Sequence, residues 1–94
     1  MEKSEKERAI LVILNDRGLH TRPSTELAKC ASSFESEISL RYHQMKVDAK
    51  SLIDILMLAA PRGAKIEVEA EGLDAKEAID AILELGKNKF CIHY

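Results

Sequence analysis

The chain has 94 residues, enough for one small domain but near the lower limit at which a single hydrophobic core suffices. Hydrophobic residues make up 46% and charged residues 32% of it, which is typical of a globular protein and excludes an intrinsically disordered one. The net charge of −2, the mixing of acidic with basic residues, and the presence of only two Tyr and two Phe argue against nucleic acid as the main partner.

No apolar run is long enough to span a bilayer, and the charged residues 1–8 lack the apolar core of a signal peptide. We therefore expect a cytoplasmic protein without membrane insertion. Cys30 and Cys91 form neither a CxxC pair nor a ligand cluster with the three histidines, so no metal and no cofactor are predicted. Two free thiols are expected, with one disulfide as the alternative.

Residues 9–14 form a continuous apolar run, AILVIL, which predicts a strand covered on both faces. Residues 15–18 contain the turn formers Asn, Asp and Gly. From Thr21 to Ser33 apolar residues recur at helical spacing, which predicts an amphipathic helix that begins at His20. The apolar positions of this helix are Leu27, Ala28, Ala31 and Phe34.

The segment Gly18-Leu19-His20-Thr21-Arg22-Pro23 spans this junction of turn and helix. Neutral imidazole has one ring nitrogen with a free lone pair, which can attack phosphorus. The first N–H groups of a helix and its dipole can hold the phosphoryl oxygens, and Arg22 can bind them with two hydrogen bonds. Pro23 fits a first helical turn, where its missing N–H costs nothing. The spacing predicts a histidine that accepts and transfers a phosphoryl group; the alternative is a histidine that merely precedes a helix.

Residues 38–42 alternate between apolar and polar and predict a strand with one buried face. A turn at His43-Gln44 leads to a predicted returning strand, residues 45–49. Residues 51–58 predict a short helix, which Pro61-Arg62-Gly63 ends.

Residues 66–70 show the clearest strand alternation of the chain. Asp74 and Glu77 predict a capping box for a last helix, which Gly86 is expected to end. The expected order, β-α-β-β-α-β-α, gives an α+β fold in which a four-stranded, largely antiparallel sheet carries all helices on one face.

We expect one domain, residues 9–86, with a charged extension before it, residues 1–8, and a tail after it, residues 87–94. Phe90, Cys91 and Ile92 could pack back on the domain, but the sequence does not place them.

Ser51 opens the predicted middle helix, with Asp54 three residues later. Serine is typical of an N-cap, where its hydroxyl accepts a hydrogen bond from a helical N–H and contributes about 1 kcal/mol. The helix dipole would also favour a phosphate on this hydroxyl. Leu52, Ile53 and Leu56 cannot all face the core from so short a helix, which predicts an exposed apolar patch.

From Ala9 to about Leu85, about four-fifths of its length, the chain resembles HPr, the histidine-containing phosphocarrier of the bacterial phosphoenolpyruvate:sugar phosphotransferase system. Residues 18–23 look like the active-site signature of that family, and Ala49-Lys50-Ser51-Leu52 looks like its regulatory serine segment. The Ala70-Glu71-Gly72 turn and the final helix match in spacing and order. The resemblance implies an open-faced β-sandwich.

The resemblance also implies a carrier rather than an enzyme, expected to be a monomer. Enzyme I, charged by phosphoenolpyruvate, would phosphorylate Nδ1 of His20 with Arg22 as the phosphate partner, and an enzyme IIA domain of a sugar permease would receive the group. Ser51 matches the serine that HPr kinase/phosphorylase modifies in many bacteria, although the charge of Asp54 would oppose a phosphate there. The residues that fall on the family's docking surface are Thr21, Thr25, Lys29, Leu52 and Leu56.

Two further functions are open from the sequence. A regulatory, nitrogen-type paralogue would pass the phosphoryl group to a regulatory enzyme IIA and control metabolism rather than sugar uptake. A ferredoxin-like binding module would have the same order of elements and use His20 only structurally. The chain also departs from the family pattern: Ser24 and Thr25 stand where small alanines often follow the proline, and Ala59 stands where a glycine usually follows the middle helix.

Overall fold

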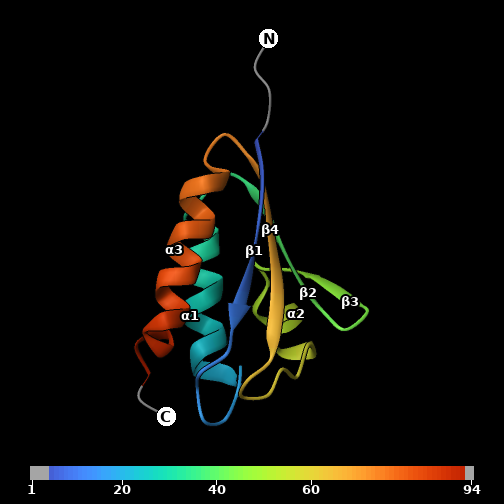
Figure 1. Cartoon of the computed structure of the whole chain (residues 1–94), viewed down its shortest axis with the longest axis vertical. Coiled ribbons are helices and arrows are strands. Elements are labelled where there is room, and N and C mark those ends of the chain that lie inside the picture. Colours follow the sequence, from blue (N-terminus) through green and yellow to red (C-terminus); the bar gives the residue numbers. More distant parts are fainter. Residues whose placement is uncertain (1–4, 93–94) are drawn as a thin grey trace.

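A four-stranded sheet with helices on one face makes up the protein, as a computed structural model of residues 5–92 shows (Figure 1). The strand order is β1-β4-β2-β3, and each neighbouring pair is antiparallel. The predicted α+β fold and order of elements are confirmed. In chain order the elements are β1 (Glu5–Val12), α1 (Thr21–Ser32), β2 (Glu37–Tyr42), β3 (Met45–Asp48), α2 (Leu52–Met57), β4 (Lys65–Gly72), α3 (Ala75–Lys87) and the short 3-10 turn η1 (Lys89–Cys91).

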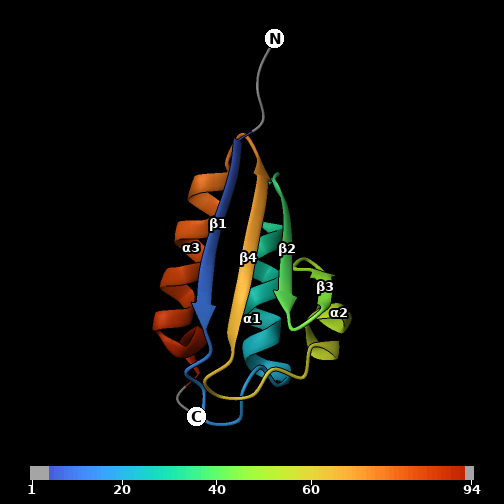
Figure 2. The ribbon, with the colours of Figure 1, turned by 45° about the vertical axis from the view of Figure 1, so that its right-hand side comes forward.

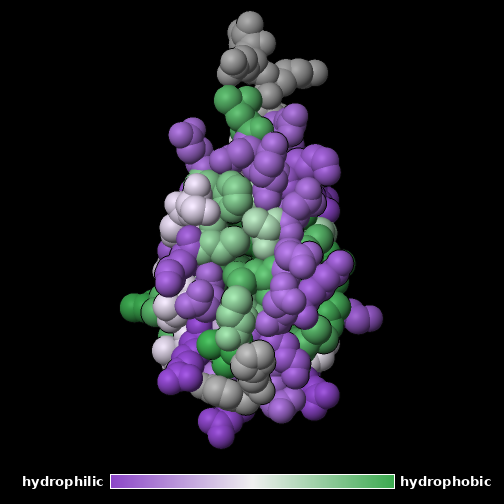
Figure 3. All heavy atoms as spheres, turned by 90° about the vertical axis from the view of Figure 1, so that its left-hand side faces the viewer, coloured by the Kyte–Doolittle hydropathy of each residue, from purple (hydrophilic) through white to green (hydrophobic). Residues whose placement is uncertain are grey.

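The core lies between the sheet and the helices. Ile66, Val68 and Ala70 of β4 are buried and alternate with glutamates on the opposite face, as the strand period requires. Helices α1 and α3 cover one face of the sheet and leave the other face open (Figure 2). On the side of the molecule where α3 lies, hydrophilic residues border a band of hydrophobic ones (Figure 3). The helical core residues include Leu27 and Ala31 of α1 and Ala75, Ala78, Ile79 and Ile82 of α3.

Strand β1 differs from its prediction in length and in burial. It begins at Glu5 instead of Ala9, so part of the expected extension belongs to the sheet. Leu11 is buried, whereas Ile10 and Val12 are exposed, and the prediction of a strand covered on both faces is wrong. The physical reason is that only one face of the sheet carries helices, so alternate side chains of this edge strand meet water.

Helix α3 begins directly after Asp74, as predicted, but the predicted capping box and the predicted end at Gly86 are wrong. Asp74 makes no side-chain cap, because its carboxylate accepts hydrogen bonds from the N–H groups of Glu35 and Ser36, each at 2.9 Å, and from the Ser36 hydroxyl. These bonds, the hydroxyl bond first, lower the pKa of Asp74. Gly86 lies inside the helix and is buried. A Cβ there would collide with the Leu11 side chain, so this glycine serves the close packing of α3 on β1.

After α3 the chain makes a left-handed turn in which Lys89, Phe90 and Cys91 have φ values of 54°, 57° and 63°. Phe90 is fully buried, so this part of the expected tail packs on the domain, while Cys91 is exposed. Residues 93–94 of that tail lie outside the described part of the chain. Within residues 5–92 no helix has the length and apolar character needed to cross a membrane.

Candidate functional site

The loop that leads to α1 is held against the segment that follows α2. Gly18 has a φ of 72°, and a Cβ there would overlap the carbonyl oxygen of Ala60 and lie 2.8 Å from Cα of Pro61. The N–H group of Leu19 donates to the same Ala60 carbonyl at 2.9 Å. Glycine is thus required for both the backbone conformation and the close approach, and the loop places His20 at the start of α1.

His20 is the N-cap residue of α1, with an extended backbone (φ −83°, ψ −167°), and its side chain makes no capping hydrogen bond. The residue is half-buried, and its Nε2 atom is buried.

The first turn of α1 is suited to an anion. It contains no acidic residue, and Thr21 and Arg22 are exposed whereas Pro23 and Ser24 are buried. Pro23 has no N–H group, and the Ser24 N–H donates to the His20 carbonyl at 3.0 Å. The amides of Thr21 and Arg22 precede this first bond of the helix and lie at the positive end of its dipole. The predicted His20, Arg22 and helix start therefore lie together.

The two hydroxyl residues that follow Pro23 fix the local backbone. Ser24 Oγ donates to the Leu19 carbonyl at 2.9 Å inside the protein, and Thr25 Oγ1 donates to the Thr21 carbonyl at 2.8 Å. The role of Ser24 was missed from the sequence. A small polar residue in a buried position of the first turn is the signal that could have indicated it.

The expected docking residues lie on α1 and α2, which contact each other. Leu52 and Leu56 of α2 are half-buried. The most exposed apolar side chains of that helix are instead Ile53, at 71%, and Met57, at 59%, one turn apart. The expected apolar patch is present, and it includes Met57, which the sequence analysis did not single out. The α1 residues of the set are exposed or half-buried: Thr21, Thr25 and Lys29.

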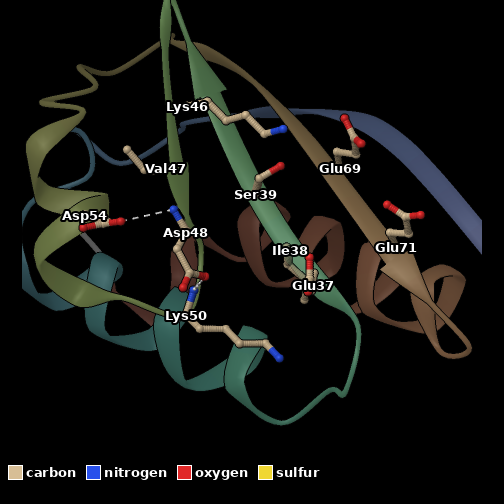
Figure 4. A pocket seen from close by; sticks show the side chains of 10 residues that line it. All are labelled: Glu37, Ile38, Ser39, Lys46, Val47, Asp48, Lys50, Asp54, Glu69 and Glu71. Carbon is tan, nitrogen blue, oxygen red and sulfur yellow. Dashed lines mark hydrogen bonds between the residues drawn. The ribbon is translucent and has the colours of Figure 1, made fainter.

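Ser51 is the N-cap of α2 as predicted, because its Oγ accepts a hydrogen bond from the Asp54 N–H at 3.2 Å. The Asp54 carboxylate accepts from the Asp48 N–H at 3.3 Å, and the Asp48 carboxylate accepts from the Lys50 N–H at 2.9 Å. Figure 4 shows Asp48, Lys50 and Asp54 at one end of an open polar hollow of about 530 Å³ beside β2 and β3. Two carboxylates thus flank Ser51.

Neither cysteine is in a disulfide. Cys30 is half-buried on α1, and burial raises the pKa of its thiol. In the part of the chain that the structure describes, no three His, Cys, Asp or Glu side chains are grouped to hold a metal ion.

Comparison with known proteins decides which family has this site. The family profile described as "PTS HPr component phosphorylation site" matches residues 7–88. The chain belongs to the HPr phosphocarrier family. The phosphocarrier protein HPr of Cupriavidus necator is 41% identical over 78 residues, which cover 83% of this chain and 88% of that protein. The phosphocarrier protein NPr of Proteus mirabilis is 41% identical over 81 residues, which cover 85% and 90%.

A solved HPr structure has the same fold. The crystal structure of HPr-C-His from Thermoanaerobacter tengcongensis has a TM-score of 0.89 and 35% identity, over 94% of this chain and 99% of that chain. The family and the open-faced sandwich expected from the sequence are confirmed, and membership in the HPr family counts against a ferredoxin-like binding module.

Proposed function

We propose that this HPr-family protein accepts a phosphoryl group on His20 from enzyme I and passes it to an enzyme IIA domain. The observation that carries the proposal is the position of His20 at the N-cap of α1, beside a first turn without acidic side chains. Backbone amides and the helix dipole favour negative charge at this position. Nε2 is buried, so we take Nδ1 as the attacking nitrogen.

In the first step the lone pair of Nδ1 attacks phosphorus, and the new P–N bond forms as the bond from phosphorus to the donor breaks. The donor keeps the electron pair of the broken bond. In the second step a nucleophile of the acceptor attacks the same phosphorus, and the electron pair of the P–N bond returns to His20. The exposed guanidinium of Arg22 binds the phosphoryl oxygens in between.

The exposure of the site fits a carrier rather than an enzyme. Tight enclosure of the phosphorylated state would lower its transfer potential by the same free energy, whereas His20 is only half-buried and Arg22 is exposed. Turnover comes from the partner proteins, in the cytoplasm, with the carrier as a monomer. The partners would dock over α1 and α2, including the exposed Ile53 and Met57, in brief encounters.

The experiment is intact-mass spectrometry after incubation with the cognate enzyme I, Mg²⁺ and phosphoenolpyruvate at neutral pH. We expect one acid-labile adduct of about 80 Da, the mass of a phosphoryl group, on the native chain. His43→Ala is the matched control, because His43 is exposed in the turn between β2 and β3. The adduct should persist in His43→Ala and vanish in His20→Ala. An adduct on His20→Ala, or none on the native chain, would contradict the proposal.

A nitrogen-type regulatory function is the second candidate, because the NPr relative is as similar as the HPr relative, each at 41% identity. Both functions use the same first step. They separate when the phosphorylated protein is offered a sugar-type and a regulatory enzyme IIA in parallel. Faster transfer to the sugar-type acceptor supports the sugar branch, and faster transfer to the regulatory acceptor supports the alternative.

A further inference from the structure

The C-terminal turn lies at the same end of the molecule as the start of α1. Helices α1 and α3 run in opposite directions, so the last turn of α3 and the first turn of α1 meet there (Figure 1). Asn15, which begins the loop before His20, is fully buried. Its Nδ2 donates to the Lys89 carbonyl at 2.9 Å and to the Ile92 carbonyl at 3.4 Å.

The conformation of this turn is strained. Its three residues with positive φ are closed by two hydrogen bonds, from the Cys91 N–H to the Asn88 carbonyl and from the Ile92 N–H to the Lys89 carbonyl, both at 2.9 Å. Left-handed backbone in residues other than glycine persists only where the surroundings determine it. Here the side chain of Phe90, which is buried in the core, fixes the turn on one side. The hydrogen bond from Asn15, in the loop before His20, fixes it on the other.

The turn also borders the candidate site. Ile92 is half-buried and lines an open hollow of about 310 Å³. The other residues that line this hollow are Thr21, Arg22, Thr25 and Glu26 of α1. The C-terminal turn is therefore one wall of the hollow that Arg22 also lines. An arginine side chain has many rotamers, and ordering it is costly in entropy, so a wall on one side favours the placement that a phosphoryl group needs.

We propose that Asn15 is a positioning residue for phosphoryl transfer, which holds the C-terminal turn so that Ile92 confines Arg22 beside His20. The carbonyl of Asn15 also accepts the Gly18 N–H at 2.9 Å, so one residue ties both the turn and the loop to the site. This inference rests on the proposed function of His20.

The first test is the rate of phosphorylation by enzyme I and phosphoenolpyruvate in Asn15→Ala. We expect the rate at saturating phosphorylated enzyme I to fall about tenfold, with the half-saturating concentration of that donor unchanged. The reason is that the Arg22 side chain becomes less ordered, whereas the surface that contacts the donor stays the same. Asn88→Ala is the matched control. It also removes a side-chain amide bond, to the Glu84 carbonyl at 3.1 Å, but this bond joins the residue after α3 only to the last turn of α3. Asn88→Ala should behave as the native chain does.

The second test is Ile92→Ala, which shortens the wall and leaves Asn15 in place. We expect a similar fall in rate, and the double variant Asn15→Ala/Ile92→Ala should fall no further than the slower single variant. Thermal unfolding confirms that each variant is folded at the assay temperature. If Asn15→Ala does not fold, Ile92→Ala decides alone.

Three results would overturn the inference and leave the function of His20 intact. They are a native rate of phosphorylation in Ile92→Ala, equal rates in Asn15→Ala and Asn88→Ala, and additive losses of rate in the double variant. If the native chain takes no phosphoryl group, the proposed function fails and this inference fails with it.

Discussion

Gly18→Ala tests how the loop before His20 is held, and its cost can be worked out from the structure. An alanine at a φ of 72° costs about 1–2 kcal/mol in backbone conformation. The new Cβ would also overlap the Ala60 carbonyl oxygen, and relief requires the loop to move away. That movement breaks the bond from the Leu19 N–H to Ala60, which is worth about 1 kcal/mol.

We therefore expect the free energy of unfolding of Gly18→Ala to fall by about 2–3 kcal/mol. For a domain of this size, that corresponds to a decrease in Tm of about 10–20 °C. Phosphorylation by enzyme I should slow as well, because the displaced loop carries His20 with it.

Gly63→Ala is the control for this prediction. Gly63 has a φ of 85°, but no atom lies within 4 Å of the Cβ it would gain, so only the backbone cost of about 1–2 kcal/mol applies. Urea and thermal denaturation of both variants give the comparison. If Gly18→Ala is no less stable than Gly63→Ala, the close approach of the loop to Ala60 is not a constraint and the reasoning is refuted.

Three further substitutions test other parts of the structure. Asp54→Asn should raise the initial rate of Ser51 phosphorylation by an HPr kinase and ATP about two- to fivefold, because it removes a nearby negative charge; an unchanged rate would count against this view. The hydrogen bonds that lower the pKa of Asp74 stabilise the fold at pH values above the ordinary pKa of 3.8. This contribution is lost as the pH falls through the lower pKa that Asp74 has in the folded protein. Asp74→Asn should therefore be less stable than the native chain at neutral pH, and it should lose less stability on acidification. Urea denaturation of both proteins at several pH values tests this, and an equal loss of stability on acidification would contradict it. Phe90→Ala should lower the free energy of unfolding by about 3–5 kcal/mol, because Phe90 is fully buried, and a loss below about 1 kcal/mol would show that the C-terminal turn is not part of the core.

Local patterns were sufficient to predict most of the fold and the centre of the site. Strand alternation depends on neighbours two residues apart, and β4 follows it closely. The position of Pro23 and the helical spacing after it set the start of α1, and with it the place of His20. The Ser51 cap was predictable for the same reason, since its partner is only three residues away.

Features that depend on distant residues were not predictable. The same apolar run fits a strand covered on both faces or on one face only, and the helices on a single face of the sheet are what leave Ile10 facing water. Asp74 looks like a helix cap, but it binds Ser36, which is 38 residues away. Asn15 looks like a turn residue, and its bond to Lys89 spans 74 residues. A polar side chain can cap its own helix or bind a distant segment, and the sequence alone does not distinguish the two.

The central claim is that His20 carries the phosphoryl group on Nδ1. NMR of the phosphorylated protein with nitrogen-labelled histidines tests it most directly, because coupling between phosphorus and nitrogen identifies the bonded atom. The buried Nε2 predicts that the coupling appears at Nδ1 of His20. Coupling at Nε2 of His20, or at any other histidine, would contradict the account.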